Sequence, residues 1–591
     1  MLNLTINDQK VEVEEGQTIL DVAKKYKIHI PTLCHLEGKR PMGACRVCLV
    51  DVKGYKDPVT ACSTPVEQNM VIDTKSSSIR KHRKAVIELL LSEHNGECLT
   101  CSRKDNCEIK ALAEEYGITD IKFRGEKKEG VVDDSTHALS RDSAKCVHCR
   151  RCVEVCSTVQ GVAALAPQFR GFKTQIAPAF ACNMDEVTCV QCGQCAAICP
   201  VGAISEKSEI ESVFSALEDP KKFVVVQTAP AIRAALGEEF GNAPGTLVTG
   251  KMVSALRALG FDAVFDTNFT ADLTIMEEGT ELLTRLKQSL VDNKSDIALP
   301  MFTSCSPGWI MYMEHFYPSF LKNLSTCKSP QQMFGALAKT YYAKKINVDP
   351  KDMVVVSVMP CTAKKFEARR EEMNSSGYQD VDYVLTTREL ARMIKQSSID
   401  FNSLIDSQMN SPLGLSTGAA DIFGNTGGVM EAAIRTAYEI VTGNELPTKN
   451  LHLTEVAGLK GIKEAALTLT GCKGDWKFLE GATLKVAVAH GLENAKELLE
   501  NIRKGDLSYH FIEVMTCPGG CIGGGGQPRF TDNKVREKRI KALYKEDEGK
   551  AYRKSHNNPD VQKLYTEFLG KPLGHLSHKL LHTHYITKER V

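Results

Sequence analysis

Cysteine spacing constrains this chain more than any other feature of its sequence. The 591 residues include 22 cysteines, and most of these fall into tight groups or short glycine- and proline-containing motifs. The first residues alternate like a strand and show neither the basic nor the apolar region of an export signal, so we expect a cytoplasmic protein. Thiols stay reduced there, and grouped cysteines then indicate metal binding rather than disulfides. The sequence therefore predicts a chain organised around several metal centres.

The first cysteine group predicts a [2Fe–2S] domain over residues 1–78. Two strand-like segments around a turn at 7–8, followed by a helical stretch at 18–27, resemble the β-grasp fold of ferredoxins. A [2Fe–2S] cluster needs four thiolates. A zinc site with four cysteine ligands is the competing interpretation. The candidate ligands follow the pattern C-x10-C-x2-C-x13-C and are Cys34, Cys45, Cys48 and Cys62.

The second group predicts a small [4Fe–4S] domain over residues 79–125. A histidine stands one turn before three cysteines, directly after an expected helix at 77–94. A lone histidine at a helix end is usually a surface residue or a cap. This segment, however, resembles one in the large iron–sulfur subunit of respiratory complex I, which implies one imidazole and three thiolate ligands. The candidate ligands are His94, Cys98, Cys101 and Cys107.

Two copies of the run C-x2-C-x2-C-x3-C predict a two-cluster ferredoxin-like domain over residues 138–209. In bacterial two-cluster ferredoxins the fourth cysteine of each run binds the other cluster. Ser157 departs from the pattern, because a proline usually follows the fourth cysteine, and Cys182 fits neither run. The polar stretch 119–134 is expected to be a linker. One cluster takes Cys146, Cys149, Cys152 and Cys199, and the other takes Cys189, Cys192, Cys195 and Cys156.

From about residue 210 the pattern changes to apolar strands that alternate with amphipathic helices. This alternation predicts α/β units with parallel sheets over residues 210–591, so the fold class is a multidomain α+β and α/β protein. One expected strand leads directly into Cys361, and chemistry in open α/β folds lies at the carboxyl ends of strands. The expected segments are strands at 222–230, 352–360 and 484–492 and helices at 250–259 and 281–290.

Three motifs in this region closely resemble the signature segments of [FeFe]-hydrogenases. They are TSCSPGW at 303–309, MPCTAKK at 359–365 and MTCPGGC at 515–521. The resemblance implies a two-lobed α/β domain around an H-cluster. In that family the H-cluster is a [4Fe–4S] cubane joined through a cysteine to a diiron subcluster, which carries CO, CN⁻ and a bridging dithiolate and is inserted by maturation proteins. By the same resemblance, Cys361, Cys517 and Cys521 bind the cubane, and Cys521 is the bridge.

The first motif departs from the family pattern, which reads Thr-Ser-Cys-Cys-Pro. In relatives the first cysteine relays protons and the second binds the cubane, so an ungapped match makes Cys305 the relay and puts Ser306 at the ligand position. Three alternatives stay open: Ser306 binds iron, the loop shifts so that Cys305 binds it, or one iron is open or water-bound. Iron prefers thiolate to a serine oxygen, which favours Cys305 as ligand, whereas the alignment favours Cys305 as relay.

The resemblance also implies a proton pathway and a set of groups around the diiron subcluster. Glu278 and Glu281 share a helix face, and ionisable groups one hydrogen bond apart can pass protons. Without the resemblance, these acids would be interpreted as a solvated helix face. Met359 and Met515 would be interpreted as part of the packed core. The pathway residues are Cys305, Glu278, Ser325, Glu281 and Arg285. The cofactor contacts are Lys364, Pro230, Ala231, Gln331, Met359, Met515, Thr426, Gly427 and Gly428.

The expected function is reversible reduction of protons to H₂, with electrons arriving through one [2Fe–2S] and three accessory [4Fe–4S] clusters. The motifs most resemble catalytic subunits of NAD-linked, electron-bifurcating complexes. No Gly-x-Gly-x-x-Gly follows a strand, so flavin and NAD(H) are expected on partner subunits. A stand-alone ferredoxin-dependent hydrogenase is the near alternative; a hydrogen sensor, an iron–sulfur assembly factor and a pure electron-transfer subunit are further rivals. A net charge of +1 and the lack of a long apolar run argue against nucleic-acid and membrane partners.

Overall fold

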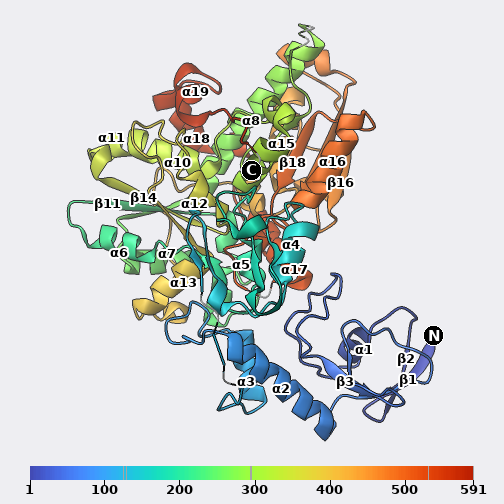
Figure 1. The fold of residues 1–591 in the computed structure, drawn as a ribbon. Coiled ribbons are helices and arrows are strands. Elements are labelled where there is room, and N and C mark those ends of the chain that lie inside the picture. Colours follow the sequence, from blue (N-terminus) through green and yellow to red (C-terminus); the bar gives the residue numbers. More distant parts are fainter. Residues whose placement is uncertain (124, 128–129, 293, 295, 530, 590–591) are drawn as a thin grey trace.

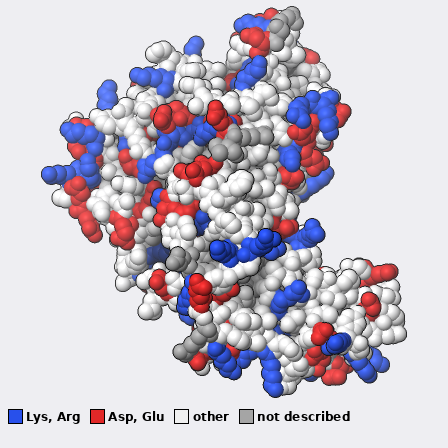
Figure 2. Space-filling view, in the orientation of Figure 1, with Lys and Arg blue, Asp and Glu red and all other residues white. Residues whose placement is uncertain are grey.

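The structure is a computed structural model that describes residues 1–123, 125–127, 130–292, 294, 296–529 and 531–589. The chain passes through three small N-terminal modules into a large α/β body, and the first module lies at one end of the molecule (Figure 1). Acidic and basic side chains are interspersed over the face drawn in Figure 2, as the net charge of +1 suggests. Among the described residues, no helix has the length and apolar character needed to cross a bilayer.

The first module is a five-stranded sheet with one helix against it. Asn7 and Asp8 both have positive φ, the backbone that a two-residue turn between antiparallel strands requires. Thr18 and Asp21 form a capping box that starts α1 (Ile19–Lys25). The sheet order is β2-β1-β5-β3-β4, with bounds β1 Leu2–Ile6, β2 Gln9–Val13, β3 Leu49–Val52, β4 Val59–Thr60 and β5 Val71–Asp73.

The second module is a helix pair, α2 (Ser77–Glu93) and α3 (Glu108–Glu115). Ser76 caps the start of α2, and His94 is the residue at which the helix ends. The buried Arg83 of α2 donates two hydrogen bonds to the carbonyl of Leu49, at 2.9 and 2.6 Å, and so joins this module to the first. The segment 119–134, expected as a linker, holds only the short strand β6 (Val132–Asp133) among its described residues; residues 124 and 128–129 lie outside them.

The third module repeats one backbone conformation, as its two cysteine runs suggest. His148 and Arg150 have φ of 50° and 62°, and the residues 43 positions later, Gln191 and Gly193, have 52° and 71°. Each pair leads into a short helix, α4 (Arg151–Thr158) or α5 (Gln194–Ile198). The strands are β7 Leu139–Asp142 and β10 Ile204–Glu206, which form a sheet with β6, and the hairpin β8 Ala166–Gln168 and β9 Gln175–Ala177.

The large body is built on two four-stranded sheets. The first has the order β12-β11-β14-β15 and is parallel throughout. The second has the order β13-β18-β17-β16, and its edge strand β16 is antiparallel to β17, so the expectation of parallel sheets fails at that strand. The side chains of β16 alternate in burial, as a half-exposed antiparallel edge allows. The strand bounds are β11 Phe223–Thr228, β12 Ala263–Asp266, β13 Met301–Phe302, β14 Met353–Met359, β15 Tyr383–Thr386, β16 Ile462–Thr468, β17 Thr483–His490 and β18 Phe511–Met515.

Helices cover both sheets, and their apolar faces form the two main cores of the body. Helix α8 contributes to both cores, so the two lobes share its length. In the first part of the body the helices are α6 Ile210–Glu218, α7 Thr249–Ala258, α8 Thr267–Leu290, α9 Pro307–Phe316, α10 Pro330–Leu337, α11 Ala343–Ile346, α12 Ala363–Glu367 and α13 Thr387–Gln396. In the second part they are α14 Gly418–Asp421, α15 Gly428–Thr442, α16 Leu492–Lys504, α17 Asn533–Glu548, α18 Pro559–Leu564 and α19 His575–Leu581.

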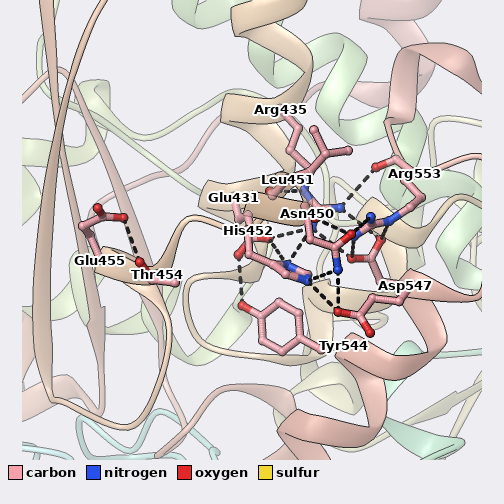
Figure 3. A network of polar contacts seen from close by, with 11 residues as sticks. Glu431, Arg435, Asn450, Leu451, His452, Thr454, Glu455, Tyr544, Asp547 and Arg553 are labelled. Carbon is pink, nitrogen blue, oxygen red and sulfur yellow. Dashed lines mark hydrogen bonds and ion pairs between the residues drawn. The ribbon is translucent and has the colours of Figure 1, made fainter. Parts of the chain in front are cut away.

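A buried ion cluster fastens α17 to α15 (Figure 3). Arg435 of α15 pairs with Glu431 at 2.6 Å and with Asp547 of α17 at 2.9 Å, and all three side chains are fully buried. Arg553 makes a second pair with Asp547 at 2.7 Å. His452 lies at the rim of the cluster and contacts Glu431 at 3.1 Å. Removing one member of such a cluster leaves another charge buried without compensation.

Asp547→Asn should therefore loosen the C-terminal helices. Glu431 would be the one carboxylate left to Arg435, and Arg553 would lose its carboxylate partner. Breaking a buried pair in this way lowers the free energy of unfolding by about 3 kcal/mol. Amide hydrogen exchange over residues 533–548 should accelerate by roughly 100-fold if that segment opens locally. The matched control is Glu548→Gln at the rim, where the side chain is 47% exposed and little should change. Equal amide exchange rates in the two variants would contradict the proposal that Asp547 holds α17 against α15.

Candidate active site and iron–sulfur ligand groups

The first cysteine group converges on one point of the N-terminal module. The Cys34 thiol is in hydrogen-bonding contact with those of Cys45 and Cys62, and Cys62 also contacts Cys48. All four side chains are buried and none is in a disulfide. Four convergent thiols of this kind are the donor set of a Cys₄ metal centre.

The second group lines a single cavity, in which His94 faces three cysteines. The Nδ1 atom of His94 lies 2.9 Å from the carbonyl oxygen of Lys145. A carbonyl can only accept, so Nδ1 carries the proton and Nε2 keeps its lone pair. Ligating histidines are commonly oriented in this way. The cavity residues from the expected ligand set are His94, Cys98, Cys101 and Cys107.

The two ferredoxin-like runs exchange their last cysteines, as the crossed assignment requires. One cavity in the third module holds three cysteines of the first run together with Cys199. Another holds three cysteines of the second run together with Cys156. Cys182 lines neither cavity.

The second run packs directly on the large body. Thr362, next to Cys361, donates a 2.8 Å hydrogen bond to the carbonyl of Gln191. Gln194 donates at 2.9 Å to the carbonyl of Gly523. A Cβ at Gly193 would lie 2.3 Å from the Thr362 hydroxyl, so only glycine permits this approach. The second cavity therefore lies beside the loop that carries Cys361.

The three motifs of the body meet where strands of both sheets end. Strand β14 ends at Met359, two residues before Cys361, and β18 ends at Met515, two residues before Cys517. The Cys361 and Cys517 thiols are in hydrogen-bonding contact, and the charge of Cys361 acts on Cys521. Met359 and Met515 lie in the cores of the first and second lobe, so packing is the role that the structure displays for both methionines.

Cys305 and Ser306 have different neighbours. The charges of Glu278 and Lys364 act on Cys305; burial, and after it the charge of Glu278, holds the pKa of the Cys305 thiol well above its ordinary range. Ser306 instead starts α9 and its Oγ lies 2.8 Å from the hydroxyl of Thr516, the residue before Cys517. The backbone N–H of Thr516 also donates to this oxygen, at 3.3 Å.

The expected pathway residues adjoin one another from Cys305 to Arg285. Glu278 is bonded to the Ser325 side chain and to the backbone N–H of Ser304. Ser325 donates its hydroxyl to Glu281 at 2.8 Å, and Glu281 pairs with Arg285 at 2.6 Å. The Arg285 side chain is 13% exposed and reaches the outer end of the chain.

Glu278 has a raised pKa. Burial, followed by the charge of Glu281, raises the pKa of Glu278 to about 8. A carboxyl group with this pKa keeps its proton at neutral pH. The chain is therefore poised with a proton on its inner carboxyl group.

Lys364 and Gln331 are held by a residue that the sequence did not reveal. Glu367 accepts from Lys364 at 2.9 Å, from Gln331 at 3.0 Å and from Ser329 at 2.8 Å through a single carboxylate oxygen. Lys364 also donates to the carbonyl of Cys305 at 3.0 Å. The signal in the sequence that could have revealed Glu367 was its i,i+3 spacing from Lys364 on a helix.

The remaining expected contacts surround the loop of Cys521. Gln527, which the sequence analysis missed, donates at 3.3 Å both to the carbonyl of Ala231, next to Pro230, and to that of Cys521. A Cβ at Gly520 would lie 2.6 Å from the backbone nitrogen of Thr426. Gly427 has φ of +90°, and Gly428 packs on the backbone of residue 422, so these two glycines shape the turn itself. Buried Glu513, also missed, accepts from Gly427 N–H at 2.6 Å.

Known protein families match segments of the large body and of all three N-terminal modules. Residues 222–525 match the family described as iron only hydrogenase large subunit, C-terminal domain, and residues 533–588 match iron hydrogenase small subunit. Three further families match the N-terminal modules. They are a 2Fe-2S iron-sulfur cluster binding domain at 1–77, the NADH-ubiquinone oxidoreductase-G iron-sulfur binding region at 83–122 and a 4Fe-4S dicluster domain at 145–203.

The similarity to individual proteins extends over the whole chain. The NADP-reducing hydrogenase subunit HndD of Solidesulfovibrio fructosivorans is 50% identical over 100% of both chains. Iron hydrogenase 1 of Clostridium pasteurianum is 42% identical over 99% of this chain and 100% of its own length. A solved structure of apo [FeFe]-hydrogenase HydA1 from Chlamydomonas reinhardtii, in a variant form, is 45% identical, with a TM-score of 0.58 over 64% of this chain and 99% of that one. The family expected from the three motifs is thus confirmed: the chain belongs to the iron-only, or [FeFe], hydrogenases and carries accessory iron–sulfur domains.

Proposed function

We propose that this chain catalyses 2H⁺ + 2e⁻ ⇌ H₂ at the point where its three cysteine motifs meet. The observation that carries the proposal is a half-buried thiol at the inner end of a proton chain, beside convergent cysteines. Cys305 faces Glu278, while Cys361, Cys517 and Cys521 converge nearby. When bound there, an H-cluster supplies the redox chemistry that joins two electrons and two protons.

The ligand groups fit one [2Fe–2S] cluster, three accessory [4Fe–4S] clusters and the cubane of an H-cluster with its CO- and CN⁻-bearing diiron subcluster. Each of the four accessory groups presents four sulfur or imidazole donors around one point. Cys98 of the second group is exposed, so an external redox partner can approach that cluster. The second run of the third module contacts the Cys361 loop, which suits the last electron transfer before the active site.

The neighbouring residues favour Cys305 as the proton relay. They favour Ser306 as the residue at the cubane position that a second cysteine holds in relatives. Cys305 shares its electrostatic surroundings with the pathway acid Glu278, as a relay must. Ser306 instead borders Thr516, which is adjacent in sequence to the expected ligand Cys517. A shifted loop with Cys305 as ligand would separate that thiol from Glu278.

We further propose that the chain works in the cytoplasm as the hydrogenase subunit of an NAD(P)-linked complex, with its diiron subcluster supplied by maturation proteins. The support is the full-length likeness to a protein named as a subunit of an NADP-reducing hydrogenase. Flavin and nucleotide sites would lie on partner subunits, because this sequence shows no dinucleotide fingerprint. Co-purification of a flavoprotein would favour the complex, whereas isolation with ferredoxin alone would favour the stand-alone enzyme.

The cluster assignment predicts a specific loss on changing His94. The matured chain should hold about 20 iron atoms, and His94→Ala should lower this by about four by removing one [4Fe–4S] cluster. Activity with a protein electron donor should then fall more than activity with a small reductant. The control is His82→Ala, an exposed histidine on the same helix, which should leave the iron content unchanged. Equal iron in both variants would return His94 to a purely structural role.

The proton chain predicts that shape-preserving changes of its acids stop turnover without disturbing the cofactor. The matured wild-type protein should form H₂ and show infrared bands of iron-bound CO and CN⁻. Glu278→Gln and Glu281→Gln should each cut turnover by roughly 10²-fold or more, because an amide cannot pass on a proton. Their infrared bands should stay in place. The exposed Glu497→Gln on α16 is the control, and near-normal rates in both pathway variants would refute the pathway.

The assignment of Cys305 and Ser306 predicts opposite effects on proton transfer and on the cubane. Cys305→Ala should abolish turnover but keep the paramagnetic signal of the cubane. Ser306→Cys should restore four-thiolate ligation and shift the cubane's signal and potential, because iron prefers thiolate to alkoxide. Loss of the cubane signal in Cys305→Ala would make Cys305 the ligand instead.

A further inference from the structure

A further set of side chains of metal-binding types, separate from the cysteine groups described above, lies at the outer half of the proton chain. Glu281, Cys327 and His582 each direct one ligand atom toward the others, and these three atoms all lie within 4.8 Å of one another. The three residues come from α8, from the segment before α10 and from the residue after α19. All three are buried, and Cys327 belongs to none of the cysteine groups described above.

The spacing suits a tetrahedral zinc ion. The Cys327 Sγ lies 3.9 Å from Glu281 Oε2 and 3.9 Å from His582 Nδ1. Zinc bonds of about 2.3 Å to sulfur and about 2.0 Å to nitrogen or oxygen imply ligand separations of roughly 3.5 Å in a tetrahedron. A closure of a few tenths of an ångström would therefore bring the sulfur to the separations expected from the other two donors, which lie within 4.8 Å of each other. One thiolate, one imidazole and one carboxylate form a donor set that zinc accepts.

The histidine is already oriented for ligation. His582 Nε2 lies 3.2 Å from Glu277 Oε2. Glu277 is fully buried and also accepts from the hydroxyls of Tyr565 and Ser577 and from the backbone N–H of Leu573, and these three donors stabilise its carboxylate form. The imidazole then donates from Nε2, so Nδ1 carries the lone pair and lies 3.9 Å from the Cys327 sulfur. A carboxylate behind the distal nitrogen is the usual support of a zinc-bound histidine.

The site lies close to the surface on the side of α19. The exposed His578 stacks on His582, with ring centroids 4.8 Å apart and planes within 4° of parallel. In the absence of a metal, the Thr326 hydroxyl lies 2.8 Å from His582 Nδ1 and satisfies its lone pair. This hydroxyl, or a water, can occupy the fourth coordination position.

We propose that Glu281, Cys327 and His582 form a Zn²⁺ site whose occupation blocks the proton chain. On binding, the Cys327 thiol releases its proton to solvent and the Glu281 carboxylate becomes a zinc ligand. Glu281 then no longer passes protons between Ser325 and Arg285. The binding site stands on geometry alone, whereas the block rests on the function proposed above.

Binding is tested without turnover, using the cluster-loaded full chain and Zn²⁺ alone. X-ray absorption at the zinc edge should show one sulfur at about 2.3 Å and the other ligands at about 2.0 Å. Cys327→Ala and Cys327→Ser should each lose the sulfur and weaken binding by at least about 10-fold. Cys182→Ala, which changes a half-buried cysteine outside every ligand group, should bind zinc like the wild type. Zinc bound without sulfur, bound equally by both Cys327 variants, or bound only with loss of cluster iron would overturn the site.

Inhibition is tested on the matured enzyme, with each variant's rate expressed relative to its own zinc-free rate. Zinc should slow H₂ formation by the wild type and by Cys182→Ala, and the Cys327 variants should need at least about 10-fold more zinc. Bound zinc that leaves the rate unchanged would overturn the block. A protein that forms no H₂ at all would instead contradict the proposed function, and the absorption measurement would still decide the zinc site.

Discussion

Direct backbone contact between the third module and the large body determines where everything else can lie. Gly193 and Gly525 make this contact possible, because a Cβ at either position would fall 2.3 Å or less from Thr362 or from the Cys192 carbonyl. With the two surfaces in contact, the hydrogen bond from Thr362 to Gln191 joins the sequence neighbours of Cys361 and Cys192. Two cysteine sets that are distant in sequence thus become adjacent, as electron transfer between them requires.

Burial then gives the acids of α8 their different characters. Glu278 is enclosed next to Glu281, and the charge of the second acid raises the pKa of the first. Glu281 keeps its charge partner Arg285 at 2.6 Å, while Glu277, one turn earlier on the helix, is satisfied by donors from the C-terminal segment. Three acids within five residues therefore have three environments: Glu278 has a raised pKa, Glu281 is paired with an arginine and Glu277 accepts from a histidine. Their surroundings, rather than their residue type, separate these roles.

The sequence was sufficient for features that depend on short spacings. Both ferredoxin-like runs, the helix that ends at His94 and the i,i+3 pair Glu278 and Glu281 are local patterns, and each has a counterpart in the structure. The support for these groups was not predictable in the same way. Gln527 reaches Ala231 across 296 positions, and His582 reaches Glu277 across 305, so no periodicity connects them. The antiparallel direction of β16 was missed because the hydrophobic pattern of a sequence indicates which face of a strand is buried and not the direction of the strand.

The C-terminal segment has a wider role than covering the body. Residues 533–588 match a family described as a hydrogenase small subunit, yet here they are continuous with the large domain. In this chain Asp547 joins α17 to α15, and His582 joins the end of α19 to the acids of α8. Because one chain carries both parts, these buried polar contacts form without the loss of translational and rotational freedom that association of separate subunits costs. The covalent link therefore secures the surroundings of Glu277 and Glu281, so the outer proton chain depends on a segment about 300 residues away.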